Sequence, residues 1–245
     1  MNKVVKFGGS SLASAEQFKK VGKIITDDKD RHFVVPSAPG KRFSKDKKVT
    51  DMLYACYAND TQAIVERAKT ASKAQLDKKF EYLGTPLSFC AKNNNLEGFK
   101  ALAEAAADIN KSIAGGTVSP LDEAVKHSSD IIFYVHDNFP DIFEAHFKDW
   151  SGCISYCTDI KIYELMYRLY GTNGMEKLVF GLISTRNVIG LKFVLEHGAD
   201  FLEYKASYYK CNALKYAEIE YNKYTDPDNP LKEIYNMLKI AAENQ

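Results

Sequence analysis

The fold is decided by residues 84–102, which read GTPLSFCAKNNNLEGFKAL. Thr85 is a good helix cap and Pro86 fits the first turn of a helix, so we expect a helix to begin here. The amide side chains of residues 93–95 compete for backbone hydrogen bonds and tolerate left-handed turns, so they end that helix. Helical spacing resumes at Phe99. The stretch predicts two helices joined by a turn, a unit that needs neighbours to bury its apolar face.

The same stretch resembles one ankyrin repeat, in which Thr-Pro-Leu-His opens the first helix and Gly-Ala-Asp follows the second. The pattern recurs along the chain, with Leu121 34 residues after Leu87 and a nearly complete exit motif, His-Gly-Ala-Asp, at residues 197–200. The five expected units open near residues 84, 119, 153, 177 and 212. The resemblance implies a solenoid of about five irregular repeats over residues 84–245. Residues 61–83 have a helical pattern and are expected to lead into or cap this array.

A different pattern occupies the first sixty residues. Residues 4–11 read VVKFGGSS, which predicts a strand followed by a glycine loop. Ser14 can cap a helix over the next residues, residues 31–40 predict a second strand and a turn, and residues 49–57 predict another helix. The predicted order is therefore β-α-β-α, with strands that are parallel because a helix crosses between them.

Three stretches give this segment a second resemblance: KFGGSS at 6–11, VPSAPGKR at 35–42 and KVTDMLY at 48–54 look like the amino terminus of bacterial aspartokinases. That resemblance implies the amino-acid kinase fold and transfer of phosphate from ATP, with magnesium, to the side chain of aspartate. It also implies the roles of individual residues. Lys6 would neutralise phosphate oxygens, Gly8, Gly9 and Ser10 would approach the phosphates, and Ser37 and Thr50 would lie on the aspartate side.

Residues 61–245 lack the Arg-Gly-Glu-type and Gly-Gly-Ser-Asp-type segments that such a kinase requires. We therefore interpret residues 1–60 as an inactive remnant or a structural cap on the first repeat, with no cofactor. The alternative is an active aspartate kinase-type phosphotransferase, or at least a nucleotide-binding protein, that uses ATP and magnesium. Calorimetric titration distinguishes the two.

The amino-acid composition limits the classes of partner that we expect the chain to bind. A net charge of +1 argues against broad electrostatic capture of nucleic acid, and no apolar run is long enough to cross a bilayer. Five cysteines in apolar contexts indicate packed thiols in the cytoplasm, and the spacing of Cys153 and Cys157, expected on one helix, does not indicate a metal site. Most aromatic residues between Tyr134 and Tyr156 are expected in the core, and any exposed ring would form a recognition patch.

The chain is thus predicted to be mainly α, an ankyrin-like helical solenoid preceded by a short β-α-β-α segment. We expect a non-catalytic module that binds another protein through its concave side, built from first helices and turn tips. The residues expected to line that side are Lys92, Asn93, Lys126 and His127. Unpaired amino-terminal strands could also join two copies of the chain edge to edge.

Overall fold

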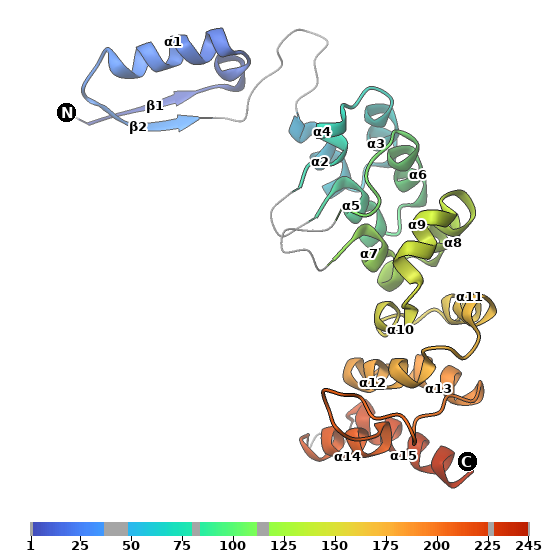
Figure 1. Cartoon of the computed structure of the whole chain (residues 1–245). Coiled ribbons are helices and arrows are strands. Elements are labelled where there is room, and N and C mark those ends of the chain that lie inside the picture. The colour runs from blue at the N-terminus through green and yellow to red at the C-terminus, as the bar shows by residue number, and fades with distance from the viewer. Residues whose placement is uncertain (1, 37–48, 80–83, 112–117, 225–227, 245) are drawn as a thin grey trace.

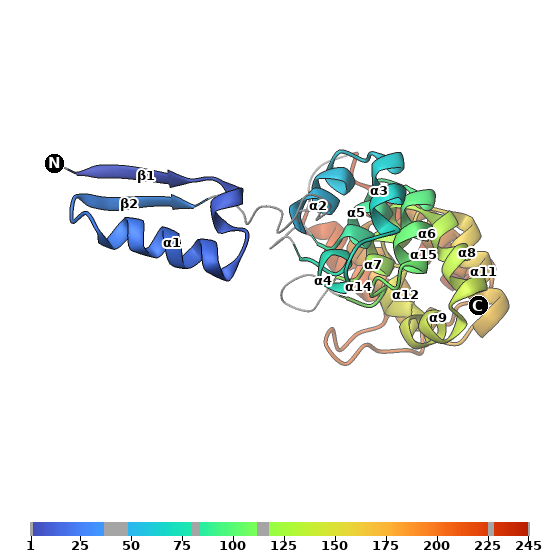
Figure 2. The ribbon, with the colours of Figure 1, turned by 90° about the horizontal axis from the view of Figure 1, so that it is seen from above.

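The structure is a computed structural model that describes residues 2–36, 49–79, 84–111, 118–224 and 228–244. It is mainly helical, and its two strands lie near the N-terminus. The buried apolar side chains fall into two separate cores, a small one within residues 2–36 and a large one that extends from α2 to α15. Figure 1 shows an α/β unit beside a long stack of helices, and Figure 2 shows the same separation from above.

The α/β unit contains one helix packed on two parallel strands. Its elements are β1 (Lys3–Phe7), the 3₁₀ helix η1 (Gly9–Leu12), α1 (Ala15–Thr26) and β2 (Arg31–Pro36). Ser14 caps α1 by accepting a hydrogen bond from the Gln17 amide at 3.3 Å, as the sequence predicts. Phe7, Leu12 and Val21 form the core between α1 and the sheet. The opposite face of the sheet is open.

The helix stack consists of helix pairs arranged in two rows. The inner row contains α2 (Val49–Tyr57), α5 (Pro86–Lys92), α7 (Pro120–His127), α10 (Trp150–Cys153), α12 (Met175–Thr185) and α14 (Ala213–Asn222). The outer row contains α3 (Thr61–Ala68), α6 (Leu96–Glu104), α8 (Ser129–Asn138), α11 (Ile160–Tyr170), α13 (Val188–Glu196) and α15 (Pro230–Glu243). Each outer helix packs against the next one along the row. The predicted succession of helix pairs is confirmed.

Helix α2 has the predicted bounds, and its buried side chains belong to the core of the stack. Met52, Leu53 and Cys56 are at most 2% exposed and belong to the large core. The region 61–83 is expected to be a helical lead-in, and its described part, residues 61–79, contains two short helices, α3 and α4 (Lys73–Leu76). Because α2 contacts α3 and α5, and α3 contacts α6, the pair α2/α3 forms a first unit ahead of the five that the sequence predicts.

The middle of the stack is irregular. An additional helix, α9 (Pro140–Phe147), follows α8, and α10 is only four residues long. Cys153 ends α10 and Cys157 lies in the connection after it, so the expectation that both sit on one helix is wrong. Pro140 lies at the start of α9, where its missing amide proton costs nothing. No described helix has both the length and the apolar character to span a membrane.

Candidate functional site

Short connections join each inner helix to its outer helix, and they follow one another along one edge of the stack, which we call the turn edge. Hydrogen bonds between successive connections hold this edge together. Asn95, the N-cap of α6, accepts from the Gly98 amide at 2.8 Å and donates to Asn59 Oδ1 at 2.7 Å and Thr61 Oγ1 at 3.0 Å in the preceding connection. A buried asparagine therefore caps one helix and bridges to the unit before it.

Asn187 has the same role at α13. Its side chain accepts from the Gly190 amide at 2.9 Å and donates to the carbonyl of Ser155 at 3.0 Å and to the hydroxyl of Tyr163 at 3.1 Å. Burial raises the pKa of Tyr163 well above its usual range, so its hydroxyl stays a neutral donor and acceptor. Buried asparagines thus join consecutive connections of the turn edge at α6 and at α13.

The structure places all four predicted partner-binding residues on this edge. Lys92 and Asn93 end α5, and Lys126 and His127 end α7, the neighbouring inner helix. All four are exposed. His127 Nε2 lies 3.6 Å from Glu123 Oε2 one turn earlier. Their proximity to one another is a finding, whereas their role in binding stays a prediction.

Two cation–π pairs on the turn edge were not predicted. Lys126 Nζ lies 5.0 Å from the centre of the Tyr156 ring, and the Arg186 guanidinium lies 4.6 Å from the ring of Tyr224. Each pair joins consecutive connections, and both tyrosines are exposed, Tyr156 by 60%. Tyr156 is the exposed member of the aromatic run that the sequence assigns mostly to the core. Its position directly after an inner helix was the signal that could have identified it.

A second group of aromatic rings surrounds the segment between α13 and α14, at the opposite ends of the inner helices. Tyr208 and Tyr209 are its exposed members, whereas Phe180 and Tyr216 are buried. The Tyr209 ring stacks on Phe180 with centroids 5.7 Å apart and lies 4.0 Å from Tyr216. Burial raises the pKa of Tyr216 to about 12, and its hydroxyl lies 3.0 Å from Ser184 Oγ. Tyr208 projects from the cluster with 86% of its surface exposed. Such rings are typical of protein-binding hot spots.

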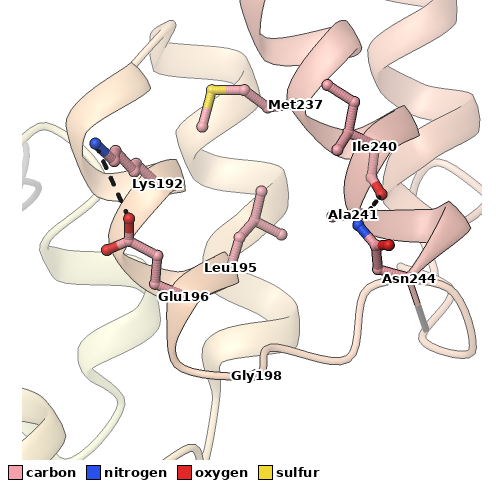
Figure 3. A pocket seen from close by; sticks show the side chains of 8 residues that line it. All are labelled: Lys192, Leu195, Glu196, Gly198, Met237, Ile240, Ala241 and Asn244. Carbon is pink, nitrogen blue, oxygen red and sulfur yellow. Dashed lines mark hydrogen bonds and ion pairs between the residues drawn. The ribbon is translucent and has the colours of Figure 1, made fainter.

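An apolar groove of about 460 Å³ lies between the outer helices α13 and α15. Figure 3 shows Leu195 from α13 facing Met237 and Ile240 from α15, with the ion pair between Lys192 and Glu196 at one rim. The Lys192 Nζ to Glu196 Oε1 distance is 3.9 Å, and both side chains are exposed. The groove offers apolar contact area without a concentrated charge.

The described residues that the kinase resemblance implies lie in two parts of the chain, beside β1 and on α2. Lys6 is exposed near the end of β1, Gly8 precedes η1, and Gly9 and Ser10 lie within η1. Thr50 lies on α2, a helix that contributes Met52, Leu53, Ala55 and Cys56 to the large core, and Ser37 lies outside the described residues. Lys6 and Thr50 thus belong to elements of different cores (Figure 1). Within the described residues, no group of His, Cys, Asp and Glu could hold a metal ion.

Comparisons with known proteins found two partial similarities, one in sequence and one in structure. No family model matches the chain. Aspartokinase 3 of Bacillus subtilis (strain 168) is 63% identical over 54 residues, which are 22% of this chain and 12% of that protein. The crystal structure of EF0377, an ankyrin repeat protein, superposes with a TM-score of 0.50 over 79% of this chain and 98% of that chain, at 18% sequence identity. The fold is therefore ankyrin-like, and a short aspartokinase-like piece accompanies it.

Proposed function

We propose that this chain is a non-catalytic protein-interaction module, in which the helix stack binds another protein through the turn edge and the inner helices. The observation that carries this proposal is the exposed cationic and aromatic row formed by Lys92, Lys126, Tyr156, Arg186 and Tyr224. Rings that already pack against cations lose little conformational entropy when a partner covers them. The ankyrin-like fold supports this use, because such solenoids present extended surfaces.

The test compares two double variants of the full chain in quantitative affinity capture from cell extract. Lys126→Glu with Arg186→Glu replaces the cation of each cation–π pair with an anion. We expect this variant to lose the proteins that the unmodified chain retains. Lys239→Glu with Arg168→Glu makes the same charge change toward the far ends of the outer helices α15 and α11 and serves as control, since both side chains are exposed. Equal retention by both variants would falsify the assignment to the turn edge.

A second proposal concerns the open face of the two-stranded sheet. Val4, Phe33 and Val35 are exposed there by 67%, 57% and 46%. Parallel sheets are normally covered on both faces, and two strands alone make a marginal sheet. We propose that a second copy of the chain covers this unit and forms a homodimer through the amino-terminal strands. Sedimentation analysis should show a dimer that Phe33→Lys converts to monomer; a monomer at all concentrations contradicts this proposal.

The aspartokinase-like piece favours one alternative function, nucleotide binding near Lys6. We propose that the piece is catalytically inactive, because the chain matches only 12% of the kinase and because Lys6 and Thr50 belong to elements of different cores. Titration calorimetry with magnesium-ATP, and separately with aspartate, should give no heat of binding. Binding that is lost in Lys6→Ala would establish the alternative. We further propose a cytoplasmic location, since Cys56, Cys90 and Cys157 are buried as packed thiols.

A further inference from the structure

Strand β2 is uncovered on both of its faces and along one edge. Its residues from His32 to Pro36 are all exposed, and Phe33, Val34 and Val35 are exposed by 57%, 38% and 46%. Within the residues that the structure describes, β2 pairs only with β1, so its other edge is unpaired. An unbroken apolar run of this kind is typical of a strand inside a parallel sheet, with neighbours on both sides.

The two edges of the sheet differ in charge. β1 carries Lys3 and Lys6, and lysine on an edge strand is a common protection against pairing with another chain. β2 contains no lysine, and its only arginine, Arg31, is its first residue. The Arg31 guanidinium is engaged within its own unit, where it donates to the Ile24 carbonyl of α1 and lies 3.6 Å from Asp28 Oδ2. The edge of β2 is therefore the one that can accept another strand.

The register of the sheet shows which side chains share a face. It pairs Val4, Val5 and Lys6 of β1 with Phe33, Val34 and Val35 of β2, in that order. Val5 packs against the small core beneath α1, and side chains alternate along a strand. Val34 is therefore on the α1 face, whereas Phe33, Val35 and Lys6 are on the open face.

Lys6 decides between two ways in which a second copy could pack against this sheet. A copy laid on the open face would bury the Lys6 ammonium groups of both copies among apolar side chains. Neither strand contains an acidic residue that could pair with them, and burial of an unpaired charge is costly. A copy added at the edge of β2 leaves both Lys6 side chains on the outer strands, in water. Edge pairing is therefore favoured over face-to-face packing.

The alternation of side chains also limits the register between two β2 strands. A twofold axis perpendicular to the sheet keeps the open faces of both copies on one side, and directly opposite residues of an antiparallel pair share a face. An axis through Val34 meets both conditions and places Phe33 of each copy opposite Val35 of the other. Aromatic and β-branched residues form favourable cross-strand pairs. An axis through Phe33 would instead place Arg31 opposite Val35.

We propose that two copies of this chain join through the free edges of their β2 strands, antiparallel and centred on Val34, to form one four-stranded sheet in the order β1-β2-β2-β1. The inference deepens the proposed homodimer and rests on it, because it names the strand and the register that join the copies. A sheet of four strands packed on two helices also exceeds the two-stranded sheet that is marginal by itself.

Single cysteines introduced into the full chain read the register, with oxidised glutathione as the oxidant. Val34→Cys should form a covalent dimer by itself, because Val34 lies opposite its own copy. Phe33→Cys and Val35→Cys should each form none alone, but a mixture of these two variants should form one. Opposite Cα atoms lie about 4.5–5.5 Å apart, within reach of a disulfide, whereas the same residue of the two copies lies about 8 Å apart. The unmodified chain, oxidised in the same way, gives the baseline from the native cysteines.

Two lysine variants distinguish edge pairing from face-to-face packing. Val35→Lys places a charge opposite Phe33 of the other copy and should raise the dissociation constant of the dimer about tenfold. Val4→Lys makes the same change on the same face of β1, away from the new strand pair, and should change the constant by less than about twofold. Sedimentation measures both constants. Equal weakening by the two variants overturns the proposal.

The outcomes also separate this proposal from the homodimer itself. Phe33, Val34 and Val35 lie outside the small core of Phe7, Leu12 and Val21, so the variants should fold. A monomer at all concentrations contradicts both the homodimer and the strand pairing. A dimer in which Phe33→Cys alone is bridged, or in which none of the three cysteines is bridged, overturns only the pairing of β2 centred on Val34.

Discussion

The α/β unit and the helix stack differ in how they bury apolar surface. The unit has a core of three buried side chains, Phe7, Leu12 and Val21, beneath one face of a two-stranded sheet. The stack has a continuous core to which every helix from α2 to α15 contributes, and each helix pair is covered by its neighbours. The aspartokinase resemblance therefore ends at a different place in the chain from the boundary between the two cores. Residues 48–54 carry part of the aspartokinase resemblance, yet Met52 and Leu53 are buried in the stack.

The first prediction tests where the boundary between the two cores lies, by comparing two truncations of the chain. Removing residues 1–48 should leave the stability of the stack nearly unchanged, because the two cores are separate. Removing residues 1–60 also takes away α2, and it should lower the free energy of unfolding by at least about 4 kcal/mol, since burial of each large apolar side chain contributes about 1.5–3 kcal/mol. Urea unfolding of both truncations measures the difference. An equal loss in the two would mean that the α/β unit itself caps the first repeat.

The second prediction concerns close packing within the stack. A Cβ at Gly190 would lie within van der Waals overlap of the Tyr163 hydroxyl and Leu182 Cδ2, both fully buried. Tyr163 cannot move freely, because its hydroxyl donates to the Cys157 carbonyl at 2.9 Å. Gly190→Ala should therefore destabilise the chain by about 3 kcal/mol.

Gly98→Ala is the matched variant in the earlier repeat. There the new Cβ would lie 2.9 Å from Asn95 Oδ1 and 3.1 Å from Cys90 Sγ, a milder overlap than at Gly190, where the atoms that it meets lie closer, so we expect a smaller loss of about 1–2 kcal/mol in the same urea titration. The reverse order of the two losses would contradict the tighter packing assigned to the Asn187 connection.

Local signals in the sequence predicted many features of the stack correctly. Thr85 caps α5, and α5 ends at Lys92, directly before the asparagines of residues 93–95. Each of these depends on side-chain chemistry within a few residues, which a sequence displays directly. The bounds of α2 were predicted for the same reason.

Contacts between units were not predictable in the same way. A nine-residue amphipathic helix such as α2 shows that it has an apolar face but not which core receives it. The pairing of Lys126 with Tyr156 depends on which connections lie side by side, and the irregular α9 and α10 obscure that alignment. The N-cap of α8, Ser128, makes no side-chain capping hydrogen bond, and only comparison with Asn95 and Asn187 in the structure reveals that difference.

The third prediction compares two helix exits that share one hydrogen-bond pattern. Ala106 and Gly198 occupy the same position, with φ of 65° and 79°, and the residue after each donates back to the preceding helix. A left-handed backbone costs an alanine about 1–2 kcal/mol, so Ala106→Gly should stabilise the chain by up to about 1 kcal/mol. Gly198→Ala should destabilise it by about 1 kcal/mol, since a new Cβ there meets no atom and only the backbone cost remains. Thermal and urea unfolding should show opposite signs; a shared sign would mean that the exits are not equivalent.

The smallest predicted effect is the pH dependence of the cap on α7. Burial raises the pKa of Asp122, but the His146 ring 3.4 Å away and the hydrogen bonds with Ser119 lower it further, so the net pKa is below its usual value. A lowered folded-state pKa gives stability that is present above the unfolded pKa of about 3.9 and is lost as the pH falls through the folded value. Asp122→Ala should therefore cost about 1 kcal/mol near pH 7, a typical capping contribution, and progressively less below about pH 4. Urea titrations at each pH measure the difference in free energy of unfolding from the unmodified chain. The control is Glu164→Ala, which removes an exposed carboxylate on α11 and for which this difference should not shrink as the pH falls.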